Sequence, residues 1–304
     1  MTDETPAIKK ASREIVPVKR SPPRDESFLA RAVRRFRKHR LAQFGLVMLV
    51  VLGLLALFAP LITPYTFDGQ DTALLGQPTP PSLAHWLGTD QLGRDNFTRI
   101  LYGARVSLSV GLSSALIATL LGTLVGALAG FFGGWVDSLL MRLTDVVLSI
   151  PILPLVIALS GFLRPSLPLL VAIIGGLGWM GTARLVRGQF LTLKSSDYVE
   201  ASRALGGSNP RIMFRHILPN ALGPIVVSTT LAVGGAIILE SALSFFGLGV
   251  QPPIPTWGNL LTGSSDFLET APWLAAFPGL FILVTVLSVN FLGDGLRDAL
   301  DPRS

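Results

Sequence analysis

Six long runs of apolar residues, separated by shorter polar segments, organise the chain. Each run has about 20 residues or more, the length that a helix needs to cross the hydrocarbon core of a bilayer. Lipid offers no hydrogen-bond partners, so a segment that crosses it must satisfy its own backbone, and the runs are therefore predicted to be helices. The predicted spans are residues 41–63, 106–130, 138–163, 167–186, 220–246 and 275–296.

The first apolar run has two interpretations, a cleaved signal peptide or a permanent helix. A signal core has about 7–15 apolar residues. This run extends over residues 41–63 and follows a charged leader of 40 residues. We therefore expect an uncleaved first transmembrane helix.

The composition also indicates a lipid environment. Of the 304 residues, 50% are hydrophobic and 14% are charged, whereas a soluble domain has about a quarter charged residues. The 31 glycines and 22 prolines are typical of membrane helices. The absence of cysteine excludes a disulfide framework, a cysteine-ligated zinc site and thiol chemistry.

Positive charge is concentrated before the first span. Residues 1–40 hold 12 Lys or Arg and 5 Asp or Glu, whereas the rest of the chain holds 13 and 14. A basic arm can bind nucleic acid, but this one ends in RRFRKHR directly before an apolar run, which favours a cytoplasmic juxtamembrane anchor. With alternating spans, 21 of the 25 Lys and Arg then lie on the cytoplasmic side.

The predicted fold class is all-α, a polytopic membrane protein with six transmembrane helices. Both termini are expected in the cytoplasm, and residues 247–274 on the external side. The parts are a basic cytoplasmic tail (1–40), a first transmembrane helix (41–63), an extracytoplasmic segment (64–105), a five-helix core (106–297) with a cytoplasmic loop (187–219), and a cytoplasmic C-terminus (298–304).

Three glycines form a ladder in the second span: Gly122, Gly126 and Gly130. Small residues on one helix face let a second backbone approach closely. We interpret the ladder as packing within the helical bundle. A dedicated dimer seam is the alternative.

The cytoplasmic segment contains a charged stretch, DYVEASRALGGSNPRIMFRHILPN (residues 197–220), between two long apolar runs. Asp197–Leu205 is long enough for a short helix. Gly206 and Gly207 are expected to end it, because glycine tolerates the left-handed conformation that a helix C-terminus often needs. The pattern predicts a helix followed by a sharp turn.

A second short helix is predicted directly after this turn. Asn209 is suited to the N-cap and Pro210 to the first helical position, and Pro219 is expected to mark the end before the fifth span. Met213 and Ile217 share one face, four residues apart. Such a shaped, partly apolar surface favours docking into the groove of a partner over a bare connection between spans.

The sequence EASRALGGSNPRIMFRHILP within this stretch resembles the EAA loop of ATP-binding-cassette importer permeases. The positions that match the pattern in register are Glu200, Ala201, Gly206, Leu218 and Pro219. Ser202 replaces the third small residue, and His216 stands where the general pattern has isoleucine. The stretch is therefore similar to the EAA loop and differs from its pattern at two positions.

Three further stretches resemble the C-type permease subunit of dipeptide and oligopeptide importers. They are HWLGTDQLGRDNFTRILYGARVSLSVG (85–111), FFGLGVQPPIPTWGNLL (245–261) and NFLGDGLRDALDPR (290–303). Together the similar regions cover most of the chain from residue 41 onward. Branches of this group also handle nickel chelates and glutathione, which stay open as alternative substrates.

The resemblance implies the type I fold of these permeases and a subunit that forms half of a peptide translocation pathway in the bacterial cytoplasmic membrane. It implies that the EAA loop sits in a cleft of an ATPase subunit. The expected coupling residues are Glu200, Ala201, Ser202, Gly206, Pro210, Arg211, Arg215, His216, Leu218 and Pro219. The implied partners are a homologous second permease, two ATP-binding subunits, an extracytoplasmic solute-binding protein and the lipid bilayer; nucleic acid is not one of them.

The chain has no GxxxxGK[ST] phosphate loop, and its only lysine after residue 38 is Lys194. ATP and magnesium are therefore expected on the partner subunits, and no cofactor is expected on this chain. The histidines are His39, His85 and His216, all outside the predicted spans, and HExxH is absent. An intramembrane protease or a zinc protease is thus disfavoured, and no metal site is predicted; a metal role for His85 is the alternative to a surface or packing role.

Charged residues within spans are costly and mark either structure or function. Arg142 and Asp145, three apart, are expected to form a structural ion pair. Glu240 is a candidate for the translocation pathway or for a pair with a partner subunit. Further charges gather near the ends of the spans. On the external side, Asp90, Arg94 and Asp95 are expected either to order their segment or to contact a binding protein. On the cytoplasmic side, Asp294, Arg297, Asp298 and Asp301 are expected either to form a C-terminal cap or to contact the ATPase.

A self-sufficient secondary transporter or channel is the competing class. Such proteins often have broken helices and ion sites in the middle of the membrane. Intramembrane charge is sparse here, and a docking loop would have no purpose in a chain that works alone.

Overall fold

The computed structural model describes residues 28–160 and 166–300. Within these ranges the chain is helical and has no strand. The first helices are α1 (Phe28–Phe36), α2 (Arg40–Leu57), α3 (Ala59–Ile62), η1 (Thr72–Leu74), α4 (Asn96–Phe132), α5 (Gly134–Ser149) and α6 (Ile152–Ser160). They are followed by α7 (Leu167–Gly176), α8 (Met180–Lys194), α9 (Asp197–Ala204), α10 (Asn209–Arg211), η2 (Ile212–Ile217), α11 (Leu218–Phe245), α12 (Trp257–Thr262), η3 (Ser265–Phe267) and α13 (Trp273–Leu300).

Four helices in the described part are long and apolar enough to cross a membrane, and two bent pairs bring the number to six if each pair is one span. The all-helical fold with up to six spans agrees with the sequence prediction. The helix of the second span begins at Asn96, earlier than the predicted residue 106, because Asp95 caps it by accepting a hydrogen bond from the Thr98 N–H at 2.8 Å.

The third and fourth spans are each interrupted by a bend, which the sequence analysis did not predict. Helices α5 and α6 meet at 78°, and α7 and α8 meet at 41°. In the first pair the break falls at Ile150, which is extended because proline disfavours a helical conformation in the residue before it, here Pro151. The end of the predicted third span, residues 161–163, lies outside the described residues.

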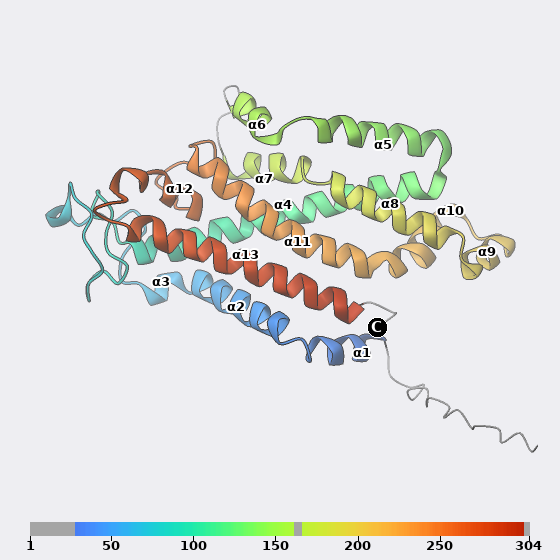
Figure 1. The fold of residues 1–304 in the computed structure, drawn as a ribbon, viewed down its shortest axis with the longest axis horizontal. Helices are drawn as coiled ribbons and strands as arrows, with labels where there is room; N and C mark the ends of the chain where they lie inside the picture. The colour runs from blue at the N-terminus through green and yellow to red at the C-terminus, as the bar shows by residue number, and fades with distance from the viewer. Residues whose placement is uncertain (1–27, 161–165, 301–304) are drawn as a thin grey trace, which may run out of the picture.

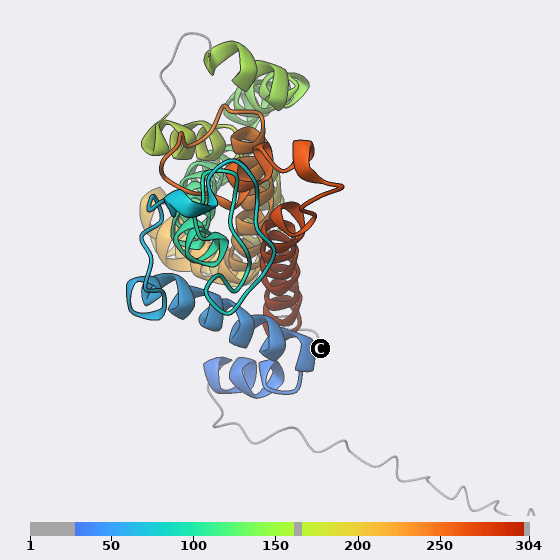
Figure 2. The same cartoon turned by 90° about the vertical axis from the view of Figure 1, so that its left-hand side faces the viewer.

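Helices α4, α8, α11 and α13 form the centre of the bundle (Figure 1). Helix α2 packs on α13, and α13 packs on α11, which in turn lies on α4. The view in Figure 2 shows α5 and α6 at one side of this bundle and α1 and α2 at the opposite side. The α5–α6 arm therefore stands apart from the first helices of the chain.

The two kinds of connecting segment lie at opposite ends of the long axis (Figure 1). The irregular segment after α3 lies at one end together with α12. Helices α9 and α10 lie at the other end, where α1 and the end of α13 also lie. This arrangement puts the loop 187–219 and the segment 64–95 on opposite sides of the bundle.

The glycine ladder of α4 lies directly against α8 of the same chain. A Cβ atom added at Gly122 would come within 2.7 Å of the Thr182 Cβ, and one added at Gly130 within 2.6 Å of the Phe190 Cβ. Real Cβ atoms do not approach other atoms so closely, so only glycine permits this spacing. The ladder thus brings the two helix backbones together within one subunit.

Replacing Gly126 tests this contact, because a Cβ there would lie 2.8 Å from the Val186 Cβ. We expect Gly126→Leu to force α4 and α8 apart and to lower stability by about 1–3 kcal/mol. Thermal unfolding of the purified chain in detergent measures the effect. The matched control is Gly188→Leu on α8, where an added Cβ meets nothing within 4 Å. An equal loss of stability in both variants would contradict the role of the ladder.

Candidate coupling surface

The end of α8 is anchored to its neighbours before the chain leaves the bundle. Lys194 donates a hydrogen bond to the Phe131 carbonyl at the end of α4, at 2.5 Å. Arg187 forms two hydrogen bonds to the carboxylate of Asp137 on α5, at 2.5 and 2.6 Å. These contacts fix where the following loop begins.

Helix α9 is short and packs through one side chain. Val199 is fully buried, whereas Asp197 and Glu200 in the first turn are exposed. Acidic residues in the first turn are favourable because the helix dipole is positive there. The outer face of α9 is therefore available to a partner.

The turn after α9 has the hydrogen bonds of a Schellman motif. The Gly207 N–H donates to the Ser202 carbonyl at 2.9 Å, and the Gly206 N–H donates to the Arg203 carbonyl at 3.0 Å. Gly206 has a φ of +79°, the left-handed conformation expected from the sequence. The turn is thus a defined corner and not an open loop.

The second half of the loop differs from the prediction in two ways. Ser208, not Asn209, occupies the N-cap position, and Asn209 and Pro210 begin the helix. Pro219 does not end the helix, because Asn209–Phe245 forms one span of 37 residues. A π-helical turn, η2, precedes Pro219, and this wider turn accommodates a residue that has no N–H to donate.

A hydrophobic cluster holds this corner against the bundle. We call it the elbow cluster; its buried members are Ala127, Phe131, Val186, Phe190, Val199, Ile212, Met213, Ile217, Ala221 and Ile225. They come from α4, α8, α9, η2 and α11. Met213 and Ile217, predicted to share a face, are both buried in it. The loop is therefore rigidly seated on two long helices.

The expected coupling residues divide into an outer and an inner group. Those that are exposed are Glu200, Ala201, Gly206, Pro210, Arg211, Arg215 and Pro219. Ser202, His216 and Leu218 are half-buried, and Leu218 packs against the elbow cluster. The structure therefore gives the inner group a packing role beside any contact with a partner.

Three large side chains on this surface were missed in the sequence analysis. Leu205 is 89% exposed, Phe214 is 61% exposed and Tyr198 is 41% exposed. Leu205 precedes the two glycines of the corner, and Phe214 lies between the buried residues of η2. We treat these three as candidates for contact with a partner, because they lie in the same charged stretch as the expected coupling residues. For Leu205, the sequence feature that could have indicated exposure is its position directly before the two glycines of the turn.

Glu240 does not line a pathway in this structure. Its side chain is fully buried and accepts hydrogen bonds from the hydroxyls of Ser107 at 2.9 Å and Ser244 at 2.7 Å. Ser107 also accepts a hydrogen bond from the Trp257 N–H at 3.2 Å. Glu240 thus joins α4, α11 and α12, a tertiary arrangement that sequence spacing does not reveal.

The expected Arg142–Asp145 pair is replaced by a different one. Asp145 forms an ion pair with Arg184 of α8 at 2.5 Å, and Arg142 is exposed. The reason is tertiary: α5 and α8 lie side by side, so a cation on the neighbouring helix reaches the carboxylate.

The charges predicted to lie outside the membrane order their own segment. Asp90 forms ion pairs with Arg94 and Arg99, each at 2.7 Å. Asp95 forms a hydrogen bond with His85 at 3.0 Å, in addition to capping α4. No cluster of three potential metal ligands is present among the described residues. His85 itself is buried, and its ring stacks on that of Tyr65 with the centroids 4.9 Å apart.

The charges predicted to lie on the cytoplasmic side are only partly described. Asp298 lies 3.5 Å from His39, which caps α2, so this pair joins the two ends of the described chain. Asp294 and Arg297 are exposed near the end of α13. Asp301 lies outside the described residues.

Comparison with known proteins gives two family matches. Residues 122–304 match the family described as binding-protein-dependent transport system inner membrane component. Residues 27–81 match the N-terminal TM domain of oligopeptide transport permease C.

Several curated proteins are similar over nearly the whole chain. The dipeptide transport system permease protein DppC of Alkalihalophilus pseudofirmus is 42% identical over 296 residues, 95% of this chain and 96% of that protein. The oligopeptide transport system permease protein OppC of Escherichia coli K12 is 45% identical over 272 residues, 90% of each chain. Among solved structures, the inward-facing MetNI methionine ABC transporter has a chain with a TM-score of 0.51 and 18% identity, covering 66% of this chain and 96% of that one. The last likeness concerns the fold alone.

Removing the buried carboxylate tests its structural role. We expect Glu240→Ala to leave the Ser107 and Ser244 hydroxyls without their acceptor and to destabilise the chain by about 1–3 kcal/mol. Glu240→Gln keeps one acceptor oxygen and should lose less. Thermal unfolding in detergent is the measurement, with Glu269→Ala, an exposed glutamate, as the control. If Glu240→Ala is as stable as the wild type, the hydrogen bonds of Glu240 to Ser107 and Ser244 do not hold the helices together.

Proposed function

The chain belongs to the family of binding-protein-dependent transport system inner membrane components, and we propose that it is a permease subunit of an ATP-driven importer of dipeptides or oligopeptides. Its similar relatives are named as dipeptide and oligopeptide permeases, and they align over nearly their full length. These names support peptides as the transported class. The chain forms half of the translocation pathway, and a homologous second permease supplies the other half.

The observation that carries this proposal is the corner between α9 and α10. It is exposed, it carries charged and apolar side chains, and it is seated on α4 and α8 by the elbow cluster. A surface with these properties fits a cleft in a partner protein. ATP is hydrolysed by two such partner subunits, since this chain has no phosphate loop.

Orientation follows from the same surface. The corner docks with ATPases in the cytoplasm, so both termini lie on that side and the segment 64–95 faces the exterior. The distribution of Lys and Arg supports this orientation. An external solute-binding protein then delivers the peptide to the α12 end of the bundle.

The structure suggests how movement passes from the ATPases to the pathway. The helix Asn209–Phe245 has 37 residues, which is about 55 Å at 1.5 Å per residue. Because it continues directly from the corner, displacement of the corner tilts the whole span. Rigid-body tilting of this kind is a common switching transition.

The apolar residue at the corner gives a direct test of docking. We expect Leu205→Glu to weaken association with the ATPase subunits, because it places a charge in the apolar part of the interface, and we expect Glu200→Lys to weaken it by reversing a charge. Co-purification of the ATPases with a tagged permease, expressed together with its partners, is the measurement. Leu83→Glu is the matched control, since Leu83 is 98% exposed at the opposite end. Unchanged co-purification of both corner variants would refute the docking surface.

The conformation of the turn can be tested separately. Gly206→Val places a β-branched residue at positive φ, which costs about 1–3 kcal/mol of local strain. We expect the variant to insert normally and to hydrolyse ATP without coupled peptide uptake in proteoliposomes. Gly76→Val is the control, because Gly76 has a φ of +100° and equally open surroundings far from the corner. If Gly206→Val transports peptide with normal coupling, the corner does not transmit movement.

A further inference from the structure

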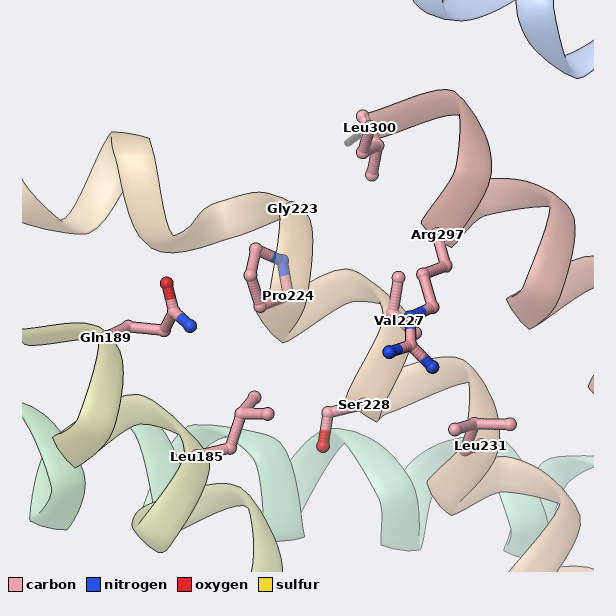
Figure 3. Close-up of a pocket in the computed structure, with 9 residues that line it drawn as sticks. All are labelled: Leu185, Gln189, Gly223, Pro224, Val227, Ser228, Leu231, Arg297 and Leu300. Carbon is pink, nitrogen blue, oxygen red and sulfur yellow. The ribbon is translucent and has the colours of Figure 1, made fainter. Parts of the chain in front are cut away.

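A groove opens on the surface of the bundle between α8, α11 and α13 (Figure 3). Its volume is about 440 Å³, more than ten times the roughly 30 Å³ that one water occupies in the liquid. Leu185 of α8 and Val227 and Leu231 of α11 form its apolar walls. The groove therefore has room and apolar surface for part of an organic molecule.

Three polar side chains, one from each helix, interrupt the apolar lining. They are Gln189 of α8, Ser228 of α11 and Arg297 of α13. Figure 3 shows the Arg297 guanidinium beside Val227 and Ser228. The groove thus combines one cation, two neutral hydrogen-bonding groups and apolar walls.

Arg297 makes no ion pair with any described residue. The next residue, Asp298, is directed to His39, at 3.5 Å. A guanidinium with no carboxylate partner among residues 28–160 and 166–300 retains its capacity for bidentate hydrogen bonding to an anion. The bound anion is therefore expected to come from outside the described chain.

The position of Arg297 along α13 places it near the membrane surface. Helix α13 has 28 residues, about 42 Å at 1.5 Å per residue, which is longer than the roughly 30 Å hydrocarbon core. Arg297 lies within the last turn, at the same end of the bundle as the corner, whereas Leu231 lies deeper along α11. A ligand that fits has its anionic group at the surface and its apolar part toward the middle of the membrane.

We propose that this groove binds an anionic phospholipid. The phosphate group pairs with Arg297 beside Ser228, whose hydroxyl also shares a hydrogen bond with that of Thr182 at 3.1 Å, and an acyl chain lies along Leu185 and Leu231. Basic pockets between membrane helices are suited to lipid headgroups of this charge. The lipid would join α8, α11 and α13 beneath the corner. This site is separate from the coupling surface and does not depend on which solute is transported.

The test compares the full transporter complex, wild type and Arg297→Gln, in nanodiscs of phosphatidylcholine with and without phosphatidylglycerol. Bound lipid is counted by mass spectrometry, and thermal stability is measured in both compositions. We expect wild type to retain and be stabilised by phosphatidylglycerol, and Arg297→Gln to lose about fivefold in its preference for that lipid. Arg142→Gln, an exposed arginine on α5, should behave as wild type.

A second variant separates the groove from its charge. Val227→Trp fills the groove and keeps Arg297, so this variant should lose bound phosphatidylglycerol while remaining monodisperse. Arg297→Lys keeps the positive charge and should retain part of the preference for phosphatidylglycerol. An unchanged lipid preference in Arg297→Gln would overturn the proposal. Stabilisation of the wild type by inorganic phosphate in detergent, equal to that by phosphatidylglycerol, would also overturn it, because the site would then bind a free anion and not a lipid. Loss of the second permease from the Arg297→Gln complex would also overturn it, since a partner's carboxylate would then be the ligand.

Discussion

The close approach of α4 and α8 is the interaction on which the rest of the structure depends. Three glycines remove the side chains that would hold these helices apart, so dispersion forces act between their backbones. With α8 held in place, Lys194 reaches the end of α4 and the chain leaves the bundle at a defined point. The elbow cluster then forms from residues of both helices and supports the corner.

Several polar groups of the bundle have a partner on another helix, which suits a bilayer that offers no hydrogen bonds of its own. Glu240 is buried and receives serine hydroxyls from two helices, and at the surface of the bundle Asp145 pairs with Arg184 of a neighbouring helix. At the α12 end of the bundle Asp90 pairs with two arginines. These contacts join segments that are distant in sequence, and they give the helices a specific register that apolar contact alone does not provide.

Much of the fold was accessible from the sequence, because apolar length and charge bias act locally. The spans, the left-handed Gly206 and the two-helix corner follow from such local rules. The bends were less accessible, although Pro151 carried a signal for one of them. Ion-pair partners and the burial of Glu240 depend on which helices become neighbours, and spacing along one helix does not contain that information. The exposure of Leu205 and Phe214 was missed because apolar residues near a turn are usually assigned to the core.

The elbow cluster has a consequence for exchanging loops between related transporters. Its members come from five helices, and only Val199 and the η2 residues belong to residues 195–217, the part of the loop between α8 and α11. A transplanted loop would therefore meet a foreign seat formed by Phe131, Val186 and Phe190. If the loop docks with an ATPase as proposed, specificity for that ATPase is a property of the loop and its platform together, and chimeras should exchange both as one unit.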